Sequence, residues 1–300
     1  LMSTGKVLLA GGAGSAGVAL NTANLYDPIT DQLQPVLATG GKSTQMLVSR
    51  MRHTAVVVPL SDPGEVLVVL TGGTNGDAEG TFWGTSDHYR DGTAPATGFD
   101  IQSSPPEMVP PRADHTATVL PGGEIVIAGG RQIGAALDQV LLGVFDESAP
   151  VNPLTYSSLP AMTDARYAHA ALLVSGGLNE PPNSPSTTGG KAVLVIGGRG
   201  SAAAIDGAEV LVRTDGEPCV LDEECLSGIC AAAPTLADPG RQVCCNDRCD
   251  EECFSCSGEL NVPASDGVCA ATIDDHALPT KCIDGGTDQT LGEDDVEVHT

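Results

Sequence analysis

Basic and aromatic side chains are scarce in this sequence. It has 14 Lys and Arg against 39 Asp and Glu, which gives a formal net charge of -25. Such a surface repels phosphate groups over most of its area, so we expect no nucleic-acid partner. The aromatic residues are 4 Phe, 4 Tyr and 1 Trp. This supply is small for a sugar site, because sugar sites normally use exposed rings.

Long apolar runs are absent, and cysteine is absent from most of the chain. No stretch approaches 18 consecutive apolar residues, so we expect no membrane-spanning segment. Residues 1–218 contain no cysteine, whereas all 10 cysteines lie between Cys219 and Cys282. Of the 39 acidic residues, 18 lie in residues 219–300 together with only three basic ones. The chain therefore joins a body to a different, acidic and cysteine-rich tail.

Glycine and proline are abundant, with 37 and 21 residues. Hydrophobic residues make up 41% of the sequence, which is enough for a packed core. Short apolar runs separated by Gly, Pro, Asn and Asp are typical of strands joined by turns. The composition therefore predicts an all-β fold.

The body repeats the motif Met-x3-Arg-x2-His three times, and a β-rich run follows each copy at residues 54–60, 116–120 and 170–174. After a turn, each repeat has a second apolar run that ends in a Gly pair, and a similar pair follows the apolar run near the start of the chain. The motif residues are Met46, Arg50 and His53; Met108, Arg112 and His115; and Met162, Arg166 and His169. The glycine pairs are Gly11 and Gly12, Gly72 and Gly73, Gly129 and Gly130, and Gly197 and Gly198.

The glycine pairs divide the body into units of similar size, because they recur 61, 57 and 68 residues apart. A third apolar run ends 14 to 16 residues after each pair, and a fourth strand is expected near Leu33, Phe99 and Tyr156 in the first three units. The third runs end at Tyr26, Tyr89, Phe145 and Val212. Each unit thus has the length and the spacing of turn residues that are typical of a four-stranded blade with long loops.

These features resemble the kelch repeat family, in which Arg-x2-His precedes the first strand and a Gly pair closes the second. The resemblance covers residues 1–217 and implies a kelch-type β-propeller. The Trp common in the fourth strand of kelch blades is missing, since Trp83 lies elsewhere. About four blades are visible, and the first is incomplete because it lacks its Arg and His. Four blades are too few for a six- or seven-bladed ring, so we expect a segment of a longer polypeptide.

The tail, residues 218–286, is dense in cysteine and poor in apolar residues, which favours a small disulfide-rich module over a zinc site. Three motifs mark the tail: Glu-Cys-x-Ser-Gly-x-Cys at residues 224–230, Cys-Cys-x3-Cys at 244–249 and Cys-x2-Cys at 253–256. With them the tail resembles cysteine-rich modules that follow repeat domains in large secreted or surface proteins of myxobacteria and related bacteria, and this resemblance implies export. Residues 287–300 are an acidic linker or the start of a further domain. The expected disulfide cysteines are Cys219, Cys225, Cys230, Cys244, Cys245, Cys249, Cys253, Cys256, Cys269 and Cys282, and the sequence assigns no pairing among them.

Catalytic motifs of related folds are not found. Kelch-type copper radical oxidases need a cysteine, which the body lacks, and we find neither an Asp-box nor a Gly-x-Ser-x-Gly elbow. The three motif histidines could be metal ligands, but we expect a repeated hydrogen-bonding device that ties each strand entry to its neighbour. The acidic clusters of the tail could bind Ca²⁺ through oxygen ligands or simply form a solvated surface. We otherwise expect no cofactor.

The sequence therefore predicts a non-catalytic recognition, adhesion or scaffold protein that is secreted or held at the cell surface. Its partner would be a protein, a glycan or further copies of the chain, and Phe82 with Trp83 forms the candidate ligand loop. One alternative is a structural subunit of an extracellular appendage or assembly. Another is an enzyme whose catalytic residues lie in N-terminal blades outside this sequence.

Overall fold

The structure is a computed structural model of the chain. It describes residues 2, 5–15, 17–60, 62, 65–76, 80–92, 97–101, 107–149, 153–175, 191–213, 225, 229–232, 242–245, 254–255 and 270–271. Within these residues every regular element is a β-strand, in agreement with the predicted all-β fold. The described part of the chain contains no helix that is long and apolar enough to cross a membrane.

The chain forms two compact units. One consists of Leu1–Leu172 with Val195–Glu209, and the other consists of Leu173–Leu194 with Val210–Thr300.

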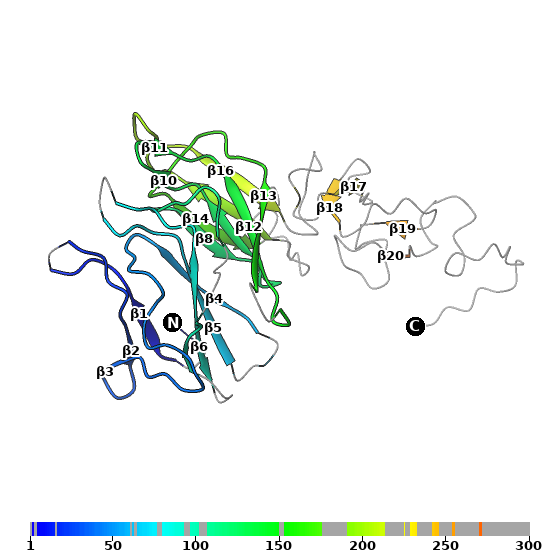
Figure 1. The fold of residues 1–300 in the computed structure, drawn as a ribbon. Helices are drawn as coiled ribbons and strands as arrows, with labels where there is room; N and C mark the ends of the chain where they lie inside the picture. Colours follow the sequence, from blue (N-terminus) through cyan, green and yellow to red (C-terminus); the bar gives the residue numbers. More distant parts are fainter. Residues whose placement is uncertain are drawn as a thin grey trace, which may run out of the picture. The chain divides into compact units, whose positions relative to one another are not determined.

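Four small sheets follow one another along the body, and one Gly pair belongs to each. The first is β1 (Val7–Ala10), β2 (Ala23–Asp27) and β3 (Gln32–Pro35); the second is β4 (Thr54–Val58), β5 (Glu65–Thr71), β6 (Ser86–Gly92) and β7 (Gly98–Phe99). The third is β8 (Thr116–Val119), β9 (Ile125–Ala128), β12 (Val140–Phe145) and β13 (Leu154–Leu159), and the fourth is β14 (Ala170–Ser175), β15 (Lys191–Ile196) and β16 (Ala208–Arg213). Figure 1 shows the first three in order, from blue through cyan to green.

Within each sheet the strands lie side by side in their order along the chain. The pairs in the first three sheets are antiparallel. The third sheet also carries the short hairpin β10 (Arg131–Gln132) and β11 (Ala135–Ala136) in the loop after its Gly pair. The expected fourth strands are present at Leu33 in β3, Phe99 in β7 and Tyr156 in β13.

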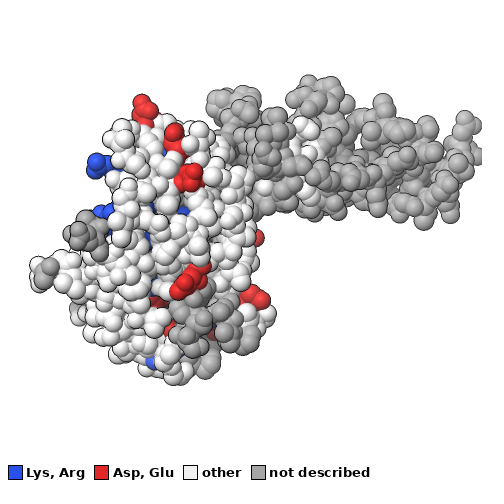
Figure 2. Space-filling model, turned by 45° about the horizontal axis from the view of Figure 1, so that its top comes forward, with Lys and Arg blue, Asp and Glu red and all other residues white. Residues whose placement is uncertain are grey.

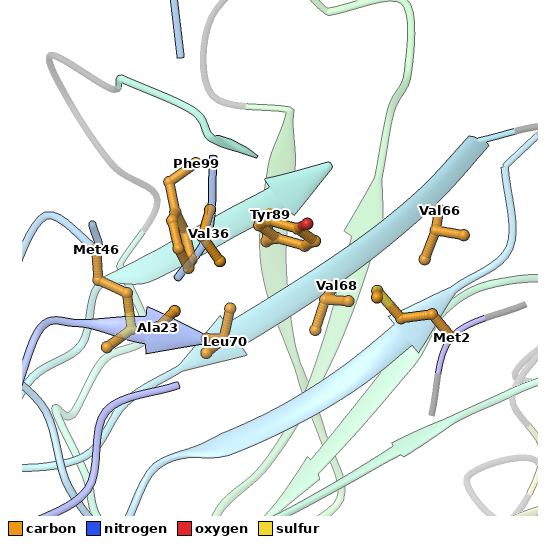
Figure 3. Packing of buried hydrophobic residues seen from close by; sticks show 9 residues of the cluster. All are labelled: Met2, Ala23, Val36, Met46, Val66, Val68, Leu70, Tyr89 and Phe99. Atoms are coloured by element: carbon orange, nitrogen blue, oxygen red, sulfur yellow. The ribbon is translucent and has the colours of Figure 1, made fainter. Parts of the chain in front are cut away.

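The core of the body lies between the sheets, as the burial of β5 shows. Val66, Val68 and Leu70 belong to one apolar cluster, while Leu67 and Val69 belong to another. Successive side chains of a strand point to opposite faces, so β5 is covered on both sides. Figure 3 shows the first cluster, in which side chains of the first sheet meet those of the second; its members are Met2, Ala23, Val36, Met46, Val66, Val68, Leu70, Tyr89 and Phe99.

The described part of the tail consists of two short antiparallel hairpins. They are β17 (Cys230–Ala232) with β18 (Gln242–Cys244), and β19 (Phe254–Ser255) with β20 (Ala270–Ala271). A disulfide joins Cys225 and Cys244, whose Cα atoms are 5.3 Å apart. Cys230 and Cys245 are also in disulfides. Six predicted disulfide cysteines lie outside the described residues: Cys219, Cys249, Cys253, Cys256, Cys269 and Cys282.

Candidate functional site

The three motif arginines are buried, and each is bound within its own sheet. Arg50, Arg112 and Arg166 have exposed fractions of 0%, 0% and 1%. Each guanidinium donates to the carbonyl oxygen of the first glycine of its pair and to a second carbonyl at the start of the third strand. Arg50, for example, donates to the oxygens of Gly72 and Thr85 at 2.5 and 2.9 Å. The arginine therefore holds the entry of the first strand to the end of the second.

A further acceptor completes each arginine site, and its chemistry varies. The Arg50 guanidinium lies 2.6 Å from Asp87, and that of Arg166 lies 2.6 Å from Glu209. Arg112 instead donates to the side-chain oxygen of Gln139. Because Arg112 is desolvated and its site contains this neutral acceptor, burial lowers the pKa of its guanidinium to about 10.

The motif histidines connect one sheet to the preceding one. The Nε2 atom of His115 lies 2.9 Å from the Thr54 hydroxyl, and that of His169 lies 2.9 Å from the Thr116 hydroxyl. His53 is hydrogen-bonded to the backbone of Ala10 in the first sheet. The arginines thus act within a sheet and the histidines act between sheets, which refines the hydrogen-bonding device expected from the sequence.

These histidines are neutral at physiological pH. Desolvation first, and then the neighbouring arginines, lowers the pKa of His53 and of His169 to about 4 and that of His115 to about 3. The buried Nδ1 atom of each has no hydrogen-bond partner. Within the described residues, no group of three His, Cys, Asp or Glu side chains is placed to hold a metal ion. The acidic clusters of the tail lie outside those residues.

The second and third glycine pairs lie between successive histidines. Gly72 has φ +67°, and a Cβ atom placed there would lie 2.5 Å from Cε1 of His115 and 3.0 Å from Cε of Met108. Gly73 has φ +93°, and its Cβ would lie 2.9 Å from Cβ of His53. Only glycine fits between the two histidines without a shift of backbone or side chain. The motif methionine thus packs on the preceding sheet.

A chain of backbone hydrogen bonds joins the residues that precede the histidines. The Asp114 amide donates to the Arg52 carbonyl at 3.0 Å, and the Ala168 amide donates to the Asp114 carbonyl at 2.8 Å. All three residues have φ between +51° and +57°. This left-handed backbone is uncommon outside glycine, so the repeated conformation is a feature of the sheet-to-sheet connection.

Side chains at the loop ends form a second cluster, which the sequence did not predict. The residue after the second, third and fourth Gly pairs forms a β-bridge with the residue after the motif arginine, as Arg131 does with Ala113 and Arg199 does with Tyr167. Nε of Arg131 lies 2.6 Å from Asp114, and the Arg131 guanidinium lies 5.7 Å from the Phe82 ring centre and 5.8 Å from that of Tyr167. We call Arg131, Asp114, Phe82 and Tyr167 the loop-end cluster.

The two residues of the predicted ligand loop have different environments. Phe82 belongs to the loop-end cluster and contacts a cation. Trp83 is half-buried, and its indole N–H donates to the Ser49 carbonyl at 3.0 Å, which anchors the loop to the motif segment. Sequence alignment of the glycine pairs could have located Arg131, but only the fold brings Phe82 and Tyr167 to it.

A separate hollow of about 300 Å³ is lined by the first sheet, by Asp91 near the end of β6 and by Thr97. Its lining includes Lys6, Asp27, Gln32, Gln34 and Asp91. The Oδ2 atom of Asp91 is buried and has no hydrogen-bond partner, while Asp27 accepts from the amides of Ile29 and Thr30. None of the repeated motif residues lies in this lining.

Charged residues are sparse on the face of the molecule in Figure 2, where red and blue atoms are scattered among white ones. This face shows no continuous basic surface of the kind that binds a phosphate backbone. Comparison with protein-family models and with curated proteins finds no match to this chain.

Proposed function

We propose that the body is a set of kelch-type propeller repeats in an exported, non-catalytic protein that recognises or scaffolds a partner. The observation that carries this proposal is the use of the motif residues. The motif arginines and histidines are the repeated side chains capable of catalysis. They are buried, or half-buried in the case of His53, and they are engaged in holding strands and sheets together. The loop-end cluster lies on the loops that follow the paired strands, and loops on a rigid scaffold are where recognition sites occur.

Export is supported by the disulfide between Cys225 and Cys244. Disulfides persist in oxidising compartments and are rare in the cytosol. The repeated hydrogen bonds, the Gly pairs and the order of small antiparallel sheets support the kelch assignment of residues 1–217.

The loop-end cluster suits a protein partner better than a glycan. The Arg131 guanidinium contacts two aromatic rings and lies beside Asp114, an arrangement that combines apolar area with a charge-assisted hydrogen bond. Arginine and aromatic residues of this kind dominate the energetics of protein interfaces.

The recognition proposal is tested by adding the labelled, secreted chain to intact cells of the organism that produces it. We expect saturable binding to the cell surface that Phe82→Ala and Arg131→Gln reduce at least about tenfold, in the range typical of interface hot spots. Ile29→Ala is the matched control, because Ile29 is 90% exposed and distant in sequence from the cluster. Equal binding by all variants would refute recognition through the loop-end cluster.

A structural subunit of an assembly is the second candidate, favoured by apolar side chains exposed on the first and fourth sheets. Leu9, Leu33 and Leu172 have exposed fractions of 50%, 58% and 52%. A subunit should form oligomers at micromolar concentration in sedimentation velocity, and Leu9→Lys with Leu33→Lys should abolish them. A recognition protein should remain monomeric in the same measurement.

A further inference from the structure

The loop that follows the second glycine pair contains an Asn-Gly sequence, Asn75 and Gly76. It is the only Asn-Gly sequence in the chain, because each of the other seven asparagines precedes a residue that has a side chain. Asn75 is exposed to solvent. Glycine leaves its own backbone nitrogen unshielded, so this nitrogen can approach the preceding carboxamide closely. The loop therefore brings an electrophilic carbon and a backbone nitrogen together at an exposed place.

The carboxamide of Asn75 is held by the opposite side of the loop. Its Oδ1 atom accepts from the Thr81 amide at 2.8 Å, and the Asn75 amide donates to the Thr81 carbonyl at 3.1 Å. A backbone N–H that points at a carbonyl oxygen stabilises the negative charge that develops there when the carbon is attacked. The Thr81 amide has this position relative to the side chain of Asn75.

The Gly76 nitrogen is held by a hydroxyl group. Its N–H donates to Oγ1 of Thr74 at 3.2 Å, and the same hydroxyl donates to the Gly76 carbonyl oxygen at 2.8 Å. Thr74 is itself buried, with an exposed fraction of 0%, so the hydroxyl has a fixed position. The nitrogen must lose its proton before it can act as a nucleophile, and Oγ1 of Thr74 accepts a hydrogen bond from this proton.

Two glycines keep the loop narrow at this point. A Cβ atom placed at Gly80 would lie 2.5 Å from the Gly76 nitrogen, and one placed at Gly76 would lie 3.2 Å from the Gly80 Cα atom. The two sides of the loop approach each other this closely because neither residue has a side chain. The close approach holds Gly76 in place while leaving its nitrogen without side-chain cover from Gly80.

We propose that Asn75 is a modification site, at which the folded protein deamidates without an enzyme. The Gly76 nitrogen passes its proton to water by way of the Thr74 hydroxyl oxygen, and its electron pair forms a bond to Cγ of Asn75. The bond between Cγ and Nδ2 breaks, and Nδ2 takes a proton from water and leaves as ammonia. A further water molecule adds to a carbonyl carbon of the cyclic imide and opens it to a carboxylate. Opening at the main-chain carbonyl gives an isoaspartyl linkage.

An isoaspartyl linkage adds one carbon atom to the backbone between paired residues. Thr74 forms a β-bridge with Phe82, and the Trp83 amide donates to the Gly73 carbonyl at 2.8 Å. The added atom changes the register of this pairing, and the new carboxylate adds a negative charge. Phe82 belongs to the loop-end cluster, but the proposal does not depend on the function proposed for that cluster.

The proposal is tested by incubating the full 300-residue chain at neutral pH and physiological temperature and following its proteolytic peptides by mass spectrometry. We expect the mass gain of deamidation at Asn75 and no comparable gain at Asn21 or Asn24. Methylation by protein isoaspartyl methyltransferase identifies the linkage. Asn75→Gln is the matched control, and it should stay unmodified because its longer side chain would have to close a larger ring.

Thr74 provides the specific readout. Thr74→Val should slow deamidation at least about threefold, because it removes the acceptor of the Gly76 proton. Thr74→Ser keeps the hydroxyl and should keep the rate. Wild-type chain unfolded in concentrated urea should also react at least about threefold more slowly than the folded chain, because it lacks the Thr81 hydrogen bond. Thermal unfolding of both variants verifies that they are folded during the incubation.

Trp83 reports on the expected change in the loop, since it is the only tryptophan in the chain. Its fluorescence should change in step with the modification in the wild type and stay constant in Asn75→Gln.

Three results would overturn the proposal. The first is modification of Asn21 or Asn24 at a rate equal to that of Asn75. The second is a faster reaction in urea than in the folded chain, which would show that the loop protects Asn75. The third is an equal rate in the wild type and in a folded Thr74→Val variant. None of these measurements involves a binding partner, so they stand or fall separately from the recognition proposal.

Discussion

The imidazole Nε2 atom of His115 lies 2.9 Å from the hydroxyl oxygen of Thr54, which precedes it by 61 residues in the sequence. The relationship recurs one repeat later between His169 and Thr116 at the same distance. Each of these two histidines is therefore hydrogen-bonded to the first strand of the preceding sheet. The periodic motif connects successive sheets. Substitution of one motif residue should therefore lower the free energy of unfolding of the whole body.

Substitution at a glycine pair should show the cost of filling the space between histidines. We expect Gly72→Ala to destabilise the protein by at least about 3 kcal/mol, because a left-handed backbone and a collision with His115 and the Arg112 carbonyl act together. Gly17→Ala is the matched control, since Gly17 has φ +72° with no atom within 4 Å of its Cβ position. It should cost only about 1 kcal/mol. Urea unfolding measures both, and equal losses would show that the space at Gly72 is not restricted.

A carboxylate next to Arg112 should stabilise the protein. Gln139→Glu places the charge that Asp87 and Glu209 supply to the other two arginines. We expect about 1 kcal/mol of added stability and a higher pKa for Arg112, because a charge-assisted hydrogen bond replaces a neutral one. Gln34→Glu, at an exposed position, controls for the added negative charge. Destabilisation by Gln139→Glu relative to this control would contradict the assigned geometry.

The buried histidines predict a loss of stability in mild acid. Their pKa values fall from an ordinary 6.5 to about 4 for His53, His88 and His169 and to about 3 for His115, mainly through desolvation. Between pH 6.5 and pH 4 the unfolded chain therefore binds more protons than the folded chain. The free energy of unfolding is highest above pH 6.5 and decreases as the pH falls toward 4.

Urea unfolding at a series of pH values measures this dependence. His115→Leu should reduce the slope between pH 6 and pH 4 by about one proton, because the variant lacks one group with a lowered pKa. The variant starts from a lower stability, so the slope and not the absolute value is compared. A slope that is the same in both proteins would show that His115 is accessible to protonation in the folded state.

The tail makes a covalent prediction. Proteolysis of the unreduced protein after alkylation should give a peptide that contains Cys225 linked to one that contains Cys244. Neither cysteine should carry the alkylating group, whereas both should carry it when reduction precedes alkylation. Mass spectrometry distinguishes the two cases. Free thiols at these positions in protein isolated from its source would contradict export.

Sequence patterns located most of the strands but few of the contacts that hold them. The motif and the glycine pairs mark strand boundaries because left-handed backbone and buried arginine recur at fixed places in each repeat. The side-chain partners of the arginines escaped prediction because they differ in type and position. Asp87 and Glu209 lie two residues beyond the carbonyl that binds arginine, whereas Gln139 supplies both that carbonyl and its own side chain.

The loop-end cluster was missed for a different reason. Phe82 stood out because aromatic residues are rare, but nothing in the local sequence marks Tyr167 as a neighbour of Arg131. Their approach depends on the pairing of Tyr167 with Arg199 and of Ala113 with Arg131 in adjacent sheets. Contacts between sheets follow from packing and not from periodicity, so they were beyond the motif analysis.

A double-mutant cycle on Thr54 and His115 tests the central claim, that the motif connects successive sheets. Free energies of unfolding are measured for the wild type, Thr54→Val, His115→Leu and the double variant. Each single substitution leaves a buried polar partner unsatisfied or removes it, so we expect losses of about 1 to 3 kcal/mol. Because the two groups are bonded, the account predicts a coupling energy of about 1 kcal/mol or more. Additive losses would contradict it, since they would show that Thr54 and His115 stabilise the protein independently.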